Sequence, residues 1–263
     1  MVRARPGGSD LGMDKIRVSS AGPVREVVLA RGDKRNALDA EMLQALTQAF
    51  DAPPPVEERV TVIRAKGPAF CAGLDLRERS GGTVGSSSIE AMLHAIELYS
   101  LPVVAVVQGD AIAGGNELAL HCDFVVASEA ARFGMSLARI GLAPTWFLAK
   151  KLMEVAGPVG AREMLLLGDL LPAQRMAELG LIYRAVPAYE LEGAAQRVID
   201  RLAANAPLSL KAMKAVLVRQ MTFRDSLRHD DVDALVAEAG RSADAREGIA
   251  AMLERRTPRF EGR

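Results

Sequence analysis

The chain has few of the residues and patterns by which function is usually recognised. It holds two cysteines and three histidines among 263 residues, and neither cysteine is flanked by a metal-binding pattern, so neither a disulfide framework nor a metal site is predicted. Lysine plus arginine equals aspartate plus glutamate at 33 each, which argues against nucleic acid or a membrane surface as a partner. No apolar run reaches membrane-spanning length. We therefore predict a cytoplasmic location, where both thiols stay reduced.

Enough apolar residues are nevertheless present to fill a large core. The chain is 49% hydrophobic and 25% charged, a composition typical of one large domain or of a domain with an appendage. The first residues lack the apolar stretch of a secretory signal, and residues 1–15 are predicted to form a disordered leader. The rest is predicted to divide into a core over 16–195 and a helical region over 196–263.

The predicted elements give an α+β class, with strands in the front of the chain and helices in its tail. β-branched, apolar runs predict strands at 16–18, 24–31, 60–65, 103–107, 123–127 and near 183–186. Apolar residues at helical spacing predict helices at 40–50, 89–99, 146–155, 158–167, 191–204, 208–220, 223–239 and 245–255. The glycine- and serine-rich residues 80–88 predict a flexible lip.

The stretch from Pro102 to Asp123 points most clearly to chemistry. Its apolar run over 103–107 is typical of a strand buried on both faces, and the QGDAIAGG that follows is typical of a tight turn. A short helix then begins near Asn116, with Glu117 in its first turn. Free backbone N–H groups, the positive end of a helix and a carboxylate therefore meet at one point, where they suit a developing oxyanion and an acid or base.

A purely structural interpretation of the same stretch stays open at this point. Glycine-rich turns between a strand and a helix are common in α/β folds, and a glutamate in the first turn is favoured by the helix dipole alone. The turn matches neither GxxxxGK[ST] nor GxGxxG, so neither standard phosphate-binding loop is predicted.

A second motif, upstream of this stretch, carries a resemblance. The strand at 60–65 leads into FCAGLDL at 70–76, and GDAIAGGNELALHCD follows at 109–123. Three further motifs agree in order along the chain, namely NAL at 36–38, ARFG at 131–134, and LGLI at 179–182 before a Val-Pro pair. Together, over about residues 16–260, they resemble the crotonase (enoyl-CoA hydratase/isomerase) superfamily.

The resemblance implies a fold, a substrate and an assembly. Members of this superfamily build their front part as a spiral of ββα units, and their helical C-terminal region helps to form trimers, often paired into hexamers. The implied partner is an acyl-CoA thioester, with coenzyme A entering only as part of the substrate and with no metal or permanently bound cofactor. A homotrimer, or a hexamer made as a dimer of trimers, is the expected assembly.

The resemblance also implies catalytic roles. The backbone N–H groups of Leu74 and Gly114 would hold the oxygen of a thioester enolate, and Glu117 would act as general acid or base. Burial raises the pKa of such a carboxyl, whereas a helix N-terminus lowers it. The sequence does not settle the sign of the net shift.

One position departs from the family pattern. Hydratases of this family carry a second glutamate shortly after the Phe-Gly turn, where this chain has Leu137. Leucine transfers no proton, which argues against efficient hydration of ordinary enoyl thioesters. The side chains considered as substitutes, each with a structural alternative as a turn, packing or core residue, are Asp110, His94, Tyr99, Thr145 and Trp146.

For the coenzyme, the resemblance implies that the backbone around Asn36, Ala37 and Ala72 holds the adenine. Lys34 and Arg35 are suited to the phosphates. The full set of predicted substrate-binding residues is Lys34, Arg35, Asn36, Ala37, Ala72, Asp75, Asp110, Leu137 and Trp146.

Three polar residues near the motifs are assigned structural roles instead. Asp75 is expected chiefly to cap the helix that begins near Leu76. Cys71 is expected to be a small buried residue rather than a nucleophile, because no activating partner can be assigned to it. His121 is expected to be structural or exposed.

We therefore predict an enzyme of the enoyl-CoA hydratase/isomerase type, a lyase or isomerase with one clear acid/base glutamate. An acyl-CoA decarboxylase, or a carbon–carbon lyase or synthase, is the first alternative, because decarboxylation needs no base at the α-carbon and so suits Leu137. An acyl-CoA binder with little turnover is the second. A shared fold does not separate these activities.

Overall fold

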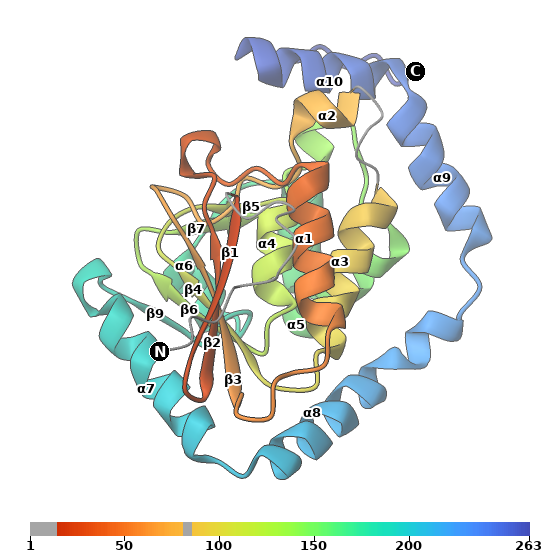
Figure 1. Ribbon diagram of the computed structural model, residues 1–263. Helices are drawn as coiled ribbons and strands as arrows, with labels where there is room; N and C mark the ends of the chain where they lie inside the picture. Colours follow the sequence, from red (N-terminus) through yellow and green to blue (C-terminus); the bar gives the residue numbers. More distant parts are fainter. Residues whose placement is uncertain (1–14, 81–85) are drawn as a thin grey trace, which may run out of the picture.

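The computed structural model describes residues 15–80 and 86–263, and it has the predicted α+β architecture (Figure 1). The predicted leader lies outside the described residues except for Lys15, and so does most of the predicted lip at 80–88. Within the described residues, no helix is both long and apolar enough to cross a membrane.

A six-stranded sheet forms the centre of the fold, in the order β1-β2-β3-β4-β6-β9. β1 and β2 pair as an antiparallel hairpin, and every later neighbour pairs in parallel. All five residues of β4 are buried, as its uninterrupted apolar run predicts. The strand bounds are β1 (Ile16–Ala21), β2 (Val24–Leu29), β3 (Val60–Ala65), β4 (Val103–Val107), β6 (Phe124–Ser128) and β9 (Arg184–Val186).

Helices cover both faces of this sheet (Figure 1). One face packs against α1 (Ala40–Asp51), α3 (Ser86–Leu98) and α4 (Gly114–Leu120), which together form the larger apolar core. The other face packs against α7 (Leu191–Ala204) in a smaller core. Alternate residues of each strand point to opposite faces, so both cores draw on the same strands.

A second sheet of three short strands was not predicted. It consists of β5 (Ala111–Ile112), β7 (Arg132–Gly134) and β8 (Leu171–Pro172), in the order β5-β7-β8. Strands of two or three residues are too short to show an alternating pattern, so nothing in the sequence distinguishes them from a turn. β5 lies within the glycine-rich turn itself and fixes its path.

The middle of the chain contains helices that are less regular than predicted. α5 (Trp146–Arg162) crosses a break at Gly157, whose φ of 61° is left-handed, and the predicted helix at 158–167 ends as a π-helical turn over Glu163–Leu167. α2 (Leu76–Ser80) and α6 (Ala173–Glu178) are short. The 3-10 turns are Gly32–Lys34, Ala138–Ile140, Ala188–Glu190 and Thr222–Ser226.

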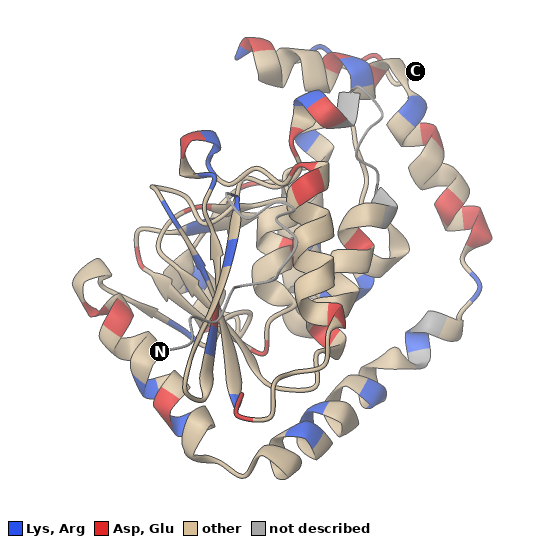
Figure 2. Ribbon diagram, viewed as in Figure 1, with Lys and Arg blue, Asp and Glu red and all other residues tan. Residues whose placement is uncertain are grey.

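The helical tail extends around the core as an arm (Figure 1). It contains α8 (Pro207–Met221), α9 (Asp230–Arg241) and α10 (Ala243–Glu254). The predicted single helix over 223–239 is wrong at its start, because a 3-10 turn is followed by extended backbone at Leu227. α9 begins only where three aspartates fall in its first turn and complement the helix dipole, which Figure 2 shows as a cluster of acidic residues.

The last helix returns to the core and docks closely. An ideal Cβ built on Gly248 of α10 would lie 2.4 Å from the carbonyl carbon of Ile140, and one on Gly141 would lie 2.7 Å from the nitrogen of Ala245. The two backbones therefore approach each other as only glycine permits. The predicted boundary at residue 195 falls inside α7, which packs on the sheet.

Candidate active site

The two motif loops lie side by side because β3 and β4 are parallel neighbours whose carboxyl ends meet at one edge. The backbone N–H groups of Phe70 and Cys71 donate to the carbonyl of Asp110 at 3.0 and 3.2 Å. The N–H of Ile112 donates to the carbonyl of Cys71 at 2.9 Å. These bonds join the FCAGLDL loop to the glycine-rich turn.

Glycines set the spacing between the loops. An ideal Cβ on Gly115 would lie 2.1 Å from the carbonyl oxygen of Cys71, and one on Gly73 would lie 3.0 Å from the nitrogen of Gly114. Real Cβ atoms do not approach other atoms as closely as 2.1 Å, so the backbone contact requires Gly115, whereas Gly73 is favoured by its left-handed φ of 87° together with its tight contact. Burial raises the pKa of the Cys71 thiol to about 12, which leaves it protonated and unreactive as predicted.

Two backbone N–H groups point toward the space between the loops. Leu38 forms a parallel bridge by donating to Gly73 and accepting from Asp75, so the N–H of Leu74 faces away from that bridge. Gly114 is the first residue of α4, where an N–H group has no intrahelical acceptor. Both residues line one cavity. Two backbone donors beside one cavity are what the stabilisation of an oxyanion requires.

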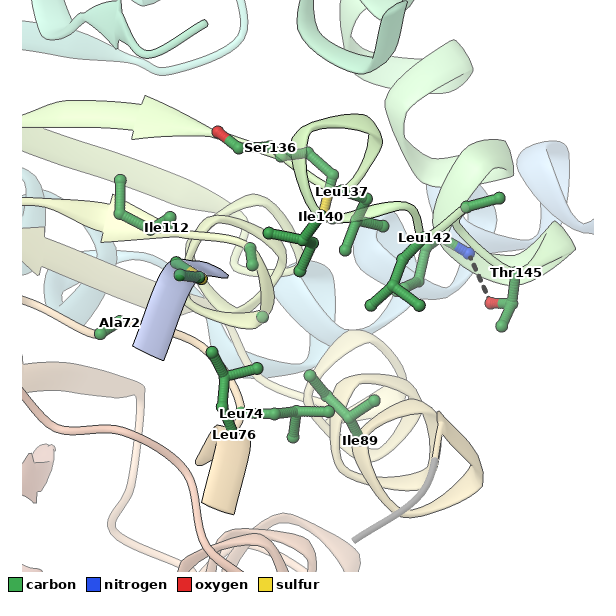
Figure 3. A pocket seen from close by; sticks show the side chains of 16 residues that line it. Ala72, Leu74, Leu76, Ile89, Ile112, Ser136, Leu137, Ile140, Leu142 and Thr145 are labelled. Atoms are coloured by element: carbon green, nitrogen blue, oxygen red, sulfur yellow. Dashed lines mark hydrogen bonds between the residues drawn. The ribbon is translucent and has the colours of Figure 1, made fainter. Parts of the chain in front are cut away.

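The cavity beside these donors is apolar (Figure 3). It is closed by side chains from both loops, from α3, from the segment after β7, from the start of α5 and from Met252 of α10. The lining residues are Ala72, Leu74, Leu76, Ile89, Ile112, Ala113, Gly114, Met135, Ser136, Leu137, Ile140, Leu142, Ala143, Thr145, Leu148 and Met252. An apolar cavity of this kind suits a hydrocarbon group attached to a carbonyl.

Glu117 lies in the first turn of α4, behind Gly114. Its side chain is fully buried, and neither carboxyl oxygen has a hydrogen-bond partner among the described residues. Burial raises the pKa of Glu117 to about 8, because desolvation outweighs the opposing charge of Lys151. The side chain therefore holds its proton near neutral pH. Such an unpaired, perturbed carboxyl is typical of a group that transfers protons.

His121 follows Glu117 by one helical turn and lies against it. Nδ1 of His121 is 2.8 Å from the backbone carbonyl of Glu117 and 3.8 Å from its carboxyl Oε2. The ring stacks on Phe147 with centroids 5.3 Å apart. Burial lowers the pKa of His121 to about 3 and keeps it neutral. The sequence prediction missed this contact, although the i, i+4 spacing was a signal for it.

Comparison with known proteins agrees with this geometry. Residues 20–263 match the family model described as enoyl-CoA hydratase/isomerase. The chain belongs to the enoyl-CoA hydratase/isomerase family. A putative enoyl-CoA hydratase of Thermus thermophilus is 36% identical over 253 residues, which cover 91% of this chain and 98% of the relative.

Solved structures extend the likeness to the whole fold. The crystal structure of an enoyl-CoA hydratase from Mycobacterium avium subsp. paratuberculosis has a TM-score of 0.82 at 30% identity, covering 94% of this chain and 98% of that one. A methylmalonyl-CoA decarboxylase has a TM-score of 0.86 at 24% identity, covering 95% and 99%. The second likeness is one of fold alone, because the identity is low.

In this family member, several predicted residues do meet at the cavity. Ala72, Leu74, Gly114 and Leu137 all line it. Leu137 lies beside the donors as an apolar wall, so no proton-transfer group stands at this position. Glu117 is not among the lining residues, and its side chain lies behind the helix start.

Other predicted residues lie elsewhere in the family fold. Trp146 stacks on His229 with centroids 4.8 Å apart and does not line the cavity. Tyr99 is buried and donates to Glu58, and His94 lies edge-on to Phe147. None of the three aromatic side chains contacts the cavity. Their observed contacts are those of packing residues, which is the structural alternative given for each of them above.

Asp110 forms ion pairs at the loop surface and does not line the cavity. Arg132 binds it through two nitrogens at 3.0 and 2.7 Å, and Arg35 binds it at 3.1 Å. The hydrogen bond and charge of Arg132 lower the pKa of Asp110. Asp110 is therefore an acceptor that holds two guanidinium groups at the surface, where Lys34 is also exposed.

The loop predicted to contact the coenzyme has an unusual backbone. Arg35 and Asn36 both have a φ of 53°, in the left-handed region. The buried Asn36 amide donates to the carbonyls of Lys66 at 2.8 Å and Ala69 at 2.9 Å, and so it holds the loop in place. Asp75 accepts from the N–H of Arg77 at 3.1 Å, which is the capping role expected for it.

The raised pKa of Glu117 predicts a pH-dependent cost to stability. Between its usual pKa of 4.5 and about 8 the folded state keeps a proton that the unfolded chain releases, so the free energy of unfolding falls as pH rises through this window. Glu117→Gln removes the cost. Its Tm should exceed that of the parent by clearly more at about pH 9 than at about pH 5, with each kcal/mol worth roughly 2–4 °C.

Thermal denaturation at both pH values measures this difference. A Tm gap that stays constant across the window would show that Glu117 is not protonated in the folded protein.

Proposed function

We propose that the protein is an acyl-CoA enzyme of the hydratase/isomerase type that stabilises a thioester enolate. The observation that carries the proposal is the pair of backbone N–H groups at Leu74 and Gly114, which face one apolar cavity. A proton added or removed beside a thioester carbonyl places negative charge on its oxygen. Fixed donors hold that charge without reorganisation, and the loss of one donor costs about 3–4 kcal/mol of transition-state stabilisation.

Glu117 is proposed to transfer the proton at the carbon beside the carbonyl. Its carboxyl is buried, has no partner among the described residues and lies one turn from Gly114. Because Glu117 does not line the cavity, its side chain must turn toward the cavity when substrate binds. Its pKa of about 8 is close to the operating pH, which is where a proton-transfer group is most effective.

Coenzyme A is proposed to lie along the Asn36–Ala37 loop and Ala72, with Lys34 and Arg35 near its phosphates. Ala72 lines the cavity, and its N–H donates to the carbonyl of Arg35 at 3.0 Å. The side chains of Lys34 and Arg35 are exposed. No metal or permanent cofactor is proposed. Among the described residues, no three His, Cys, Asp or Glu side chains are grouped to hold a metal ion.

Decarboxylation is a second candidate, because one observation favours it. When an acyl-CoA carries a carboxylate on its α-carbon, breaking the bond to that carboxylate releases CO2 and leaves an enolate that needs a proton, not a base. A carboxyl with a pKa of about 8 is already protonated at neutral pH, and Leu137 provides an apolar wall where a second carboxylate would stand. A carbon–carbon lyase or synthase, or a binder with little turnover, would use the same cavity.

A trimer, or a dimer of trimers, is the proposed assembly, and cytoplasm the proposed location. The support for assembly is the set of large apolar side chains that the arm exposes, which are Leu208, Met213, Val216, Leu217 and Leu235. Contiguous exposed apolar residues of this kind mark interaction surfaces.

The decisive experiment measures whether an enolate forms. Saturated acyl-CoA is incubated with the protein in D2O, and deuterium uptake at the α-carbon is followed by mass spectrometry. An amide-to-ester substitution at Leu74, made by incorporating the corresponding α-hydroxy acid, removes the N–H donor and keeps the side chain. We expect exchange to fall about 10²- to 10³-fold while binding of the acyl-CoA changes little.

The same backbone substitution at Val56, in an exposed loop, is the control. Its exchange rate should match that of the parent. Equal exchange in the parent and in the Leu74 ester would remove the oxyanion role from this position.

A further inference from the structure

The cavity carries polar groups at only a few points among the described residues. Of the lining side chains in the described part of the chain, those of Ser136 and Thr145 alone bear oxygen or nitrogen. The remaining lining side chains are aliphatic, apart from the sulfur of the two methionines and glycine at 114. The chemistry of these two hydroxyls therefore decides which polar acyl groups the cavity accepts.

Both hydroxyls have already donated their hydrogens to the protein. Ser136 Oγ donates to the carbonyl of Gly168 at 2.7 Å. Thr145 Oγ1 donates to a carboxyl oxygen of Glu90 in a short contact. A hydroxyl has one hydrogen and two lone pairs, so each presents only acceptor capacity to the cavity. The donors of the site are the backbone N–H groups at the thioester end.

Thr145 keeps one lone pair unused. It is the N-cap of α5, where it accepts from the N–H of Leu148 at 3.5 Å. This cap uses one lone pair, and the hydrogen goes to Glu90. The second lone pair has no partner among the described residues. The hydroxyl of Thr145 can form three hydrogen bonds, one as donor and two as acceptor. The bond to Glu90 and the cap of Leu148 use two of these, and one acceptor position is left.

Thr145 lies on the side of the cavity away from Ala72. In Figure 3, Thr145 and Ala72 stand at opposite ends of the ring of lining residues. Behind Thr145, the half-buried Glu90 follows Ile89, whose side chain lines the cavity over Gly114. On this side of the cavity, the acceptor oxygen of Thr145 therefore lines the wall and the carboxylate of Glu90 lies behind it.

We propose that this cavity selects acyl groups that carry a hydrogen-bond donor, a hydroxyl or a protonated amine, at the end remote from the thioester. The inference rests on the proposed acyl-CoA function. Thr145 receives the donor and Glu90 fixes the orientation of the hydroxyl. A carboxylate tail finds no hydrogen to accept there and meets the charge of Glu90, and a methyl tail leaves the acceptor unpaired.

Saturated acyl-CoA thioesters of one chain length, ending in methyl, hydroxyl, ammonium or carboxylate, test the proposal. Isothermal titration calorimetry gives a Kd for each without any need for turnover. The hydroxyl-ended thioester should bind roughly tenfold more tightly than the methyl-ended one, the value of about one good hydrogen bond. The carboxylate-ended thioester should bind most weakly.

Two variants of Thr145 locate the effect. Thr145→Val removes the hydroxyl at similar volume and should abolish the preference for the hydroxyl-ended thioester. Thr145→Ser keeps the hydroxyl and the cap and should retain the preference. Glu90→Gln removes the charge, so the ammonium-ended thioester should lose affinity and the carboxylate-ended one should gain it.

The outcomes separate this inference from the proposed function. If the methyl-ended thioester binds and exchanges its α-proton but the hydroxyl-ended one has no advantage, the tail preference is wrong and the enzyme proposal stands. The tail preference is equally wrong if the advantage of the hydroxyl-ended thioester persists in Thr145→Val. If none of the four thioesters binds, both the inference and the proposed function fail.

Discussion

Glu117→Gln should reduce α-proton exchange by on the order of 10²- to 10⁴-fold, the usual contribution of a positioned acid or base. The amide has the shape of the carboxyl but exchanges no proton with the substrate. If Glu117 removes the α-proton, exchange by the parent should rise with pH and level off near its pKa of about 8. If it supplies a proton to an enolate formed by decarboxylation, turnover should instead fall above that pH.

Glu129→Gln provides the matched control, because Glu129 is an exposed carboxyl after β6 and lies outside the cavity. Its exchange rate and pH profile should match those of the parent. Exchange by Glu117→Gln at the parent's rate, in a protein of unchanged Tm, would assign the proton transfer to another group and leave Glu117 a buried structural carboxyl.

Gly115→Ala should be the most destabilising single methyl addition at the site. The new Cβ would lie 2.1 Å from the carbonyl oxygen of Cys71, and that oxygen belongs to backbone already bound by Ile112. We expect a loss at or above the roughly 3 kcal/mol that marks the upper end of overpacking. The Tm should fall by about 6–12 °C. Exchange should also fall, because the contact sets the distance between the two loops.

Gly240→Ala adds the same methyl group in the last turn of α9, where no atom of the described residues lies within 4 Å of it. Alanine is the better helix former by about 0.5–1 kcal/mol, so this variant should be neutral or slightly stabilised. A Gly115→Ala protein as stable as the Gly240→Ala protein would show that the loops can separate without cost. The spacing of the loops would then not depend on Gly115.

The sequence predicted the parts of the fold that have a strong local pattern. The apolar run of β4 and the amphipathic pattern of α7 give bounds that match the structure, 103–107 and 191–204. The start of α9 was misjudged, because apolar residues continue at helical spacing through Leu227 although the backbone there is extended. Local periodicity does not reveal such a break, which depends on how the arm turns.

At the site, too, the residues marked by local motifs were predicted and those brought in by packing were not. The family motifs lead to Leu74, Gly114 and Leu137, because their positions follow from loops whose glycines are fixed by close backbone contact. Met252 lines the cavity from the far end of the chain, and no motif marks it. Glu90 is tied to the cavity only through Thr145, a contact between two helices that depends on packing distant in sequence. Such side chains become visible only in three dimensions.

The docking of α10 also orders events during synthesis. Leu74 and Gly114, whose backbone N–H groups are proposed to bind the enolate, belong to the first half of the chain, whereas the cavity wall that Met252 contributes is translated near its end. The glycine contacts at Gly141 and Gly248 close only after that segment leaves the ribosome. A nascent or proteolytically trimmed chain would thus hold the backbone N–H groups of Leu74 and Gly114 beside a cavity that lacks one wall and is open to water. Binding of an acyl thioester in the cavity would then indicate that α10 has docked.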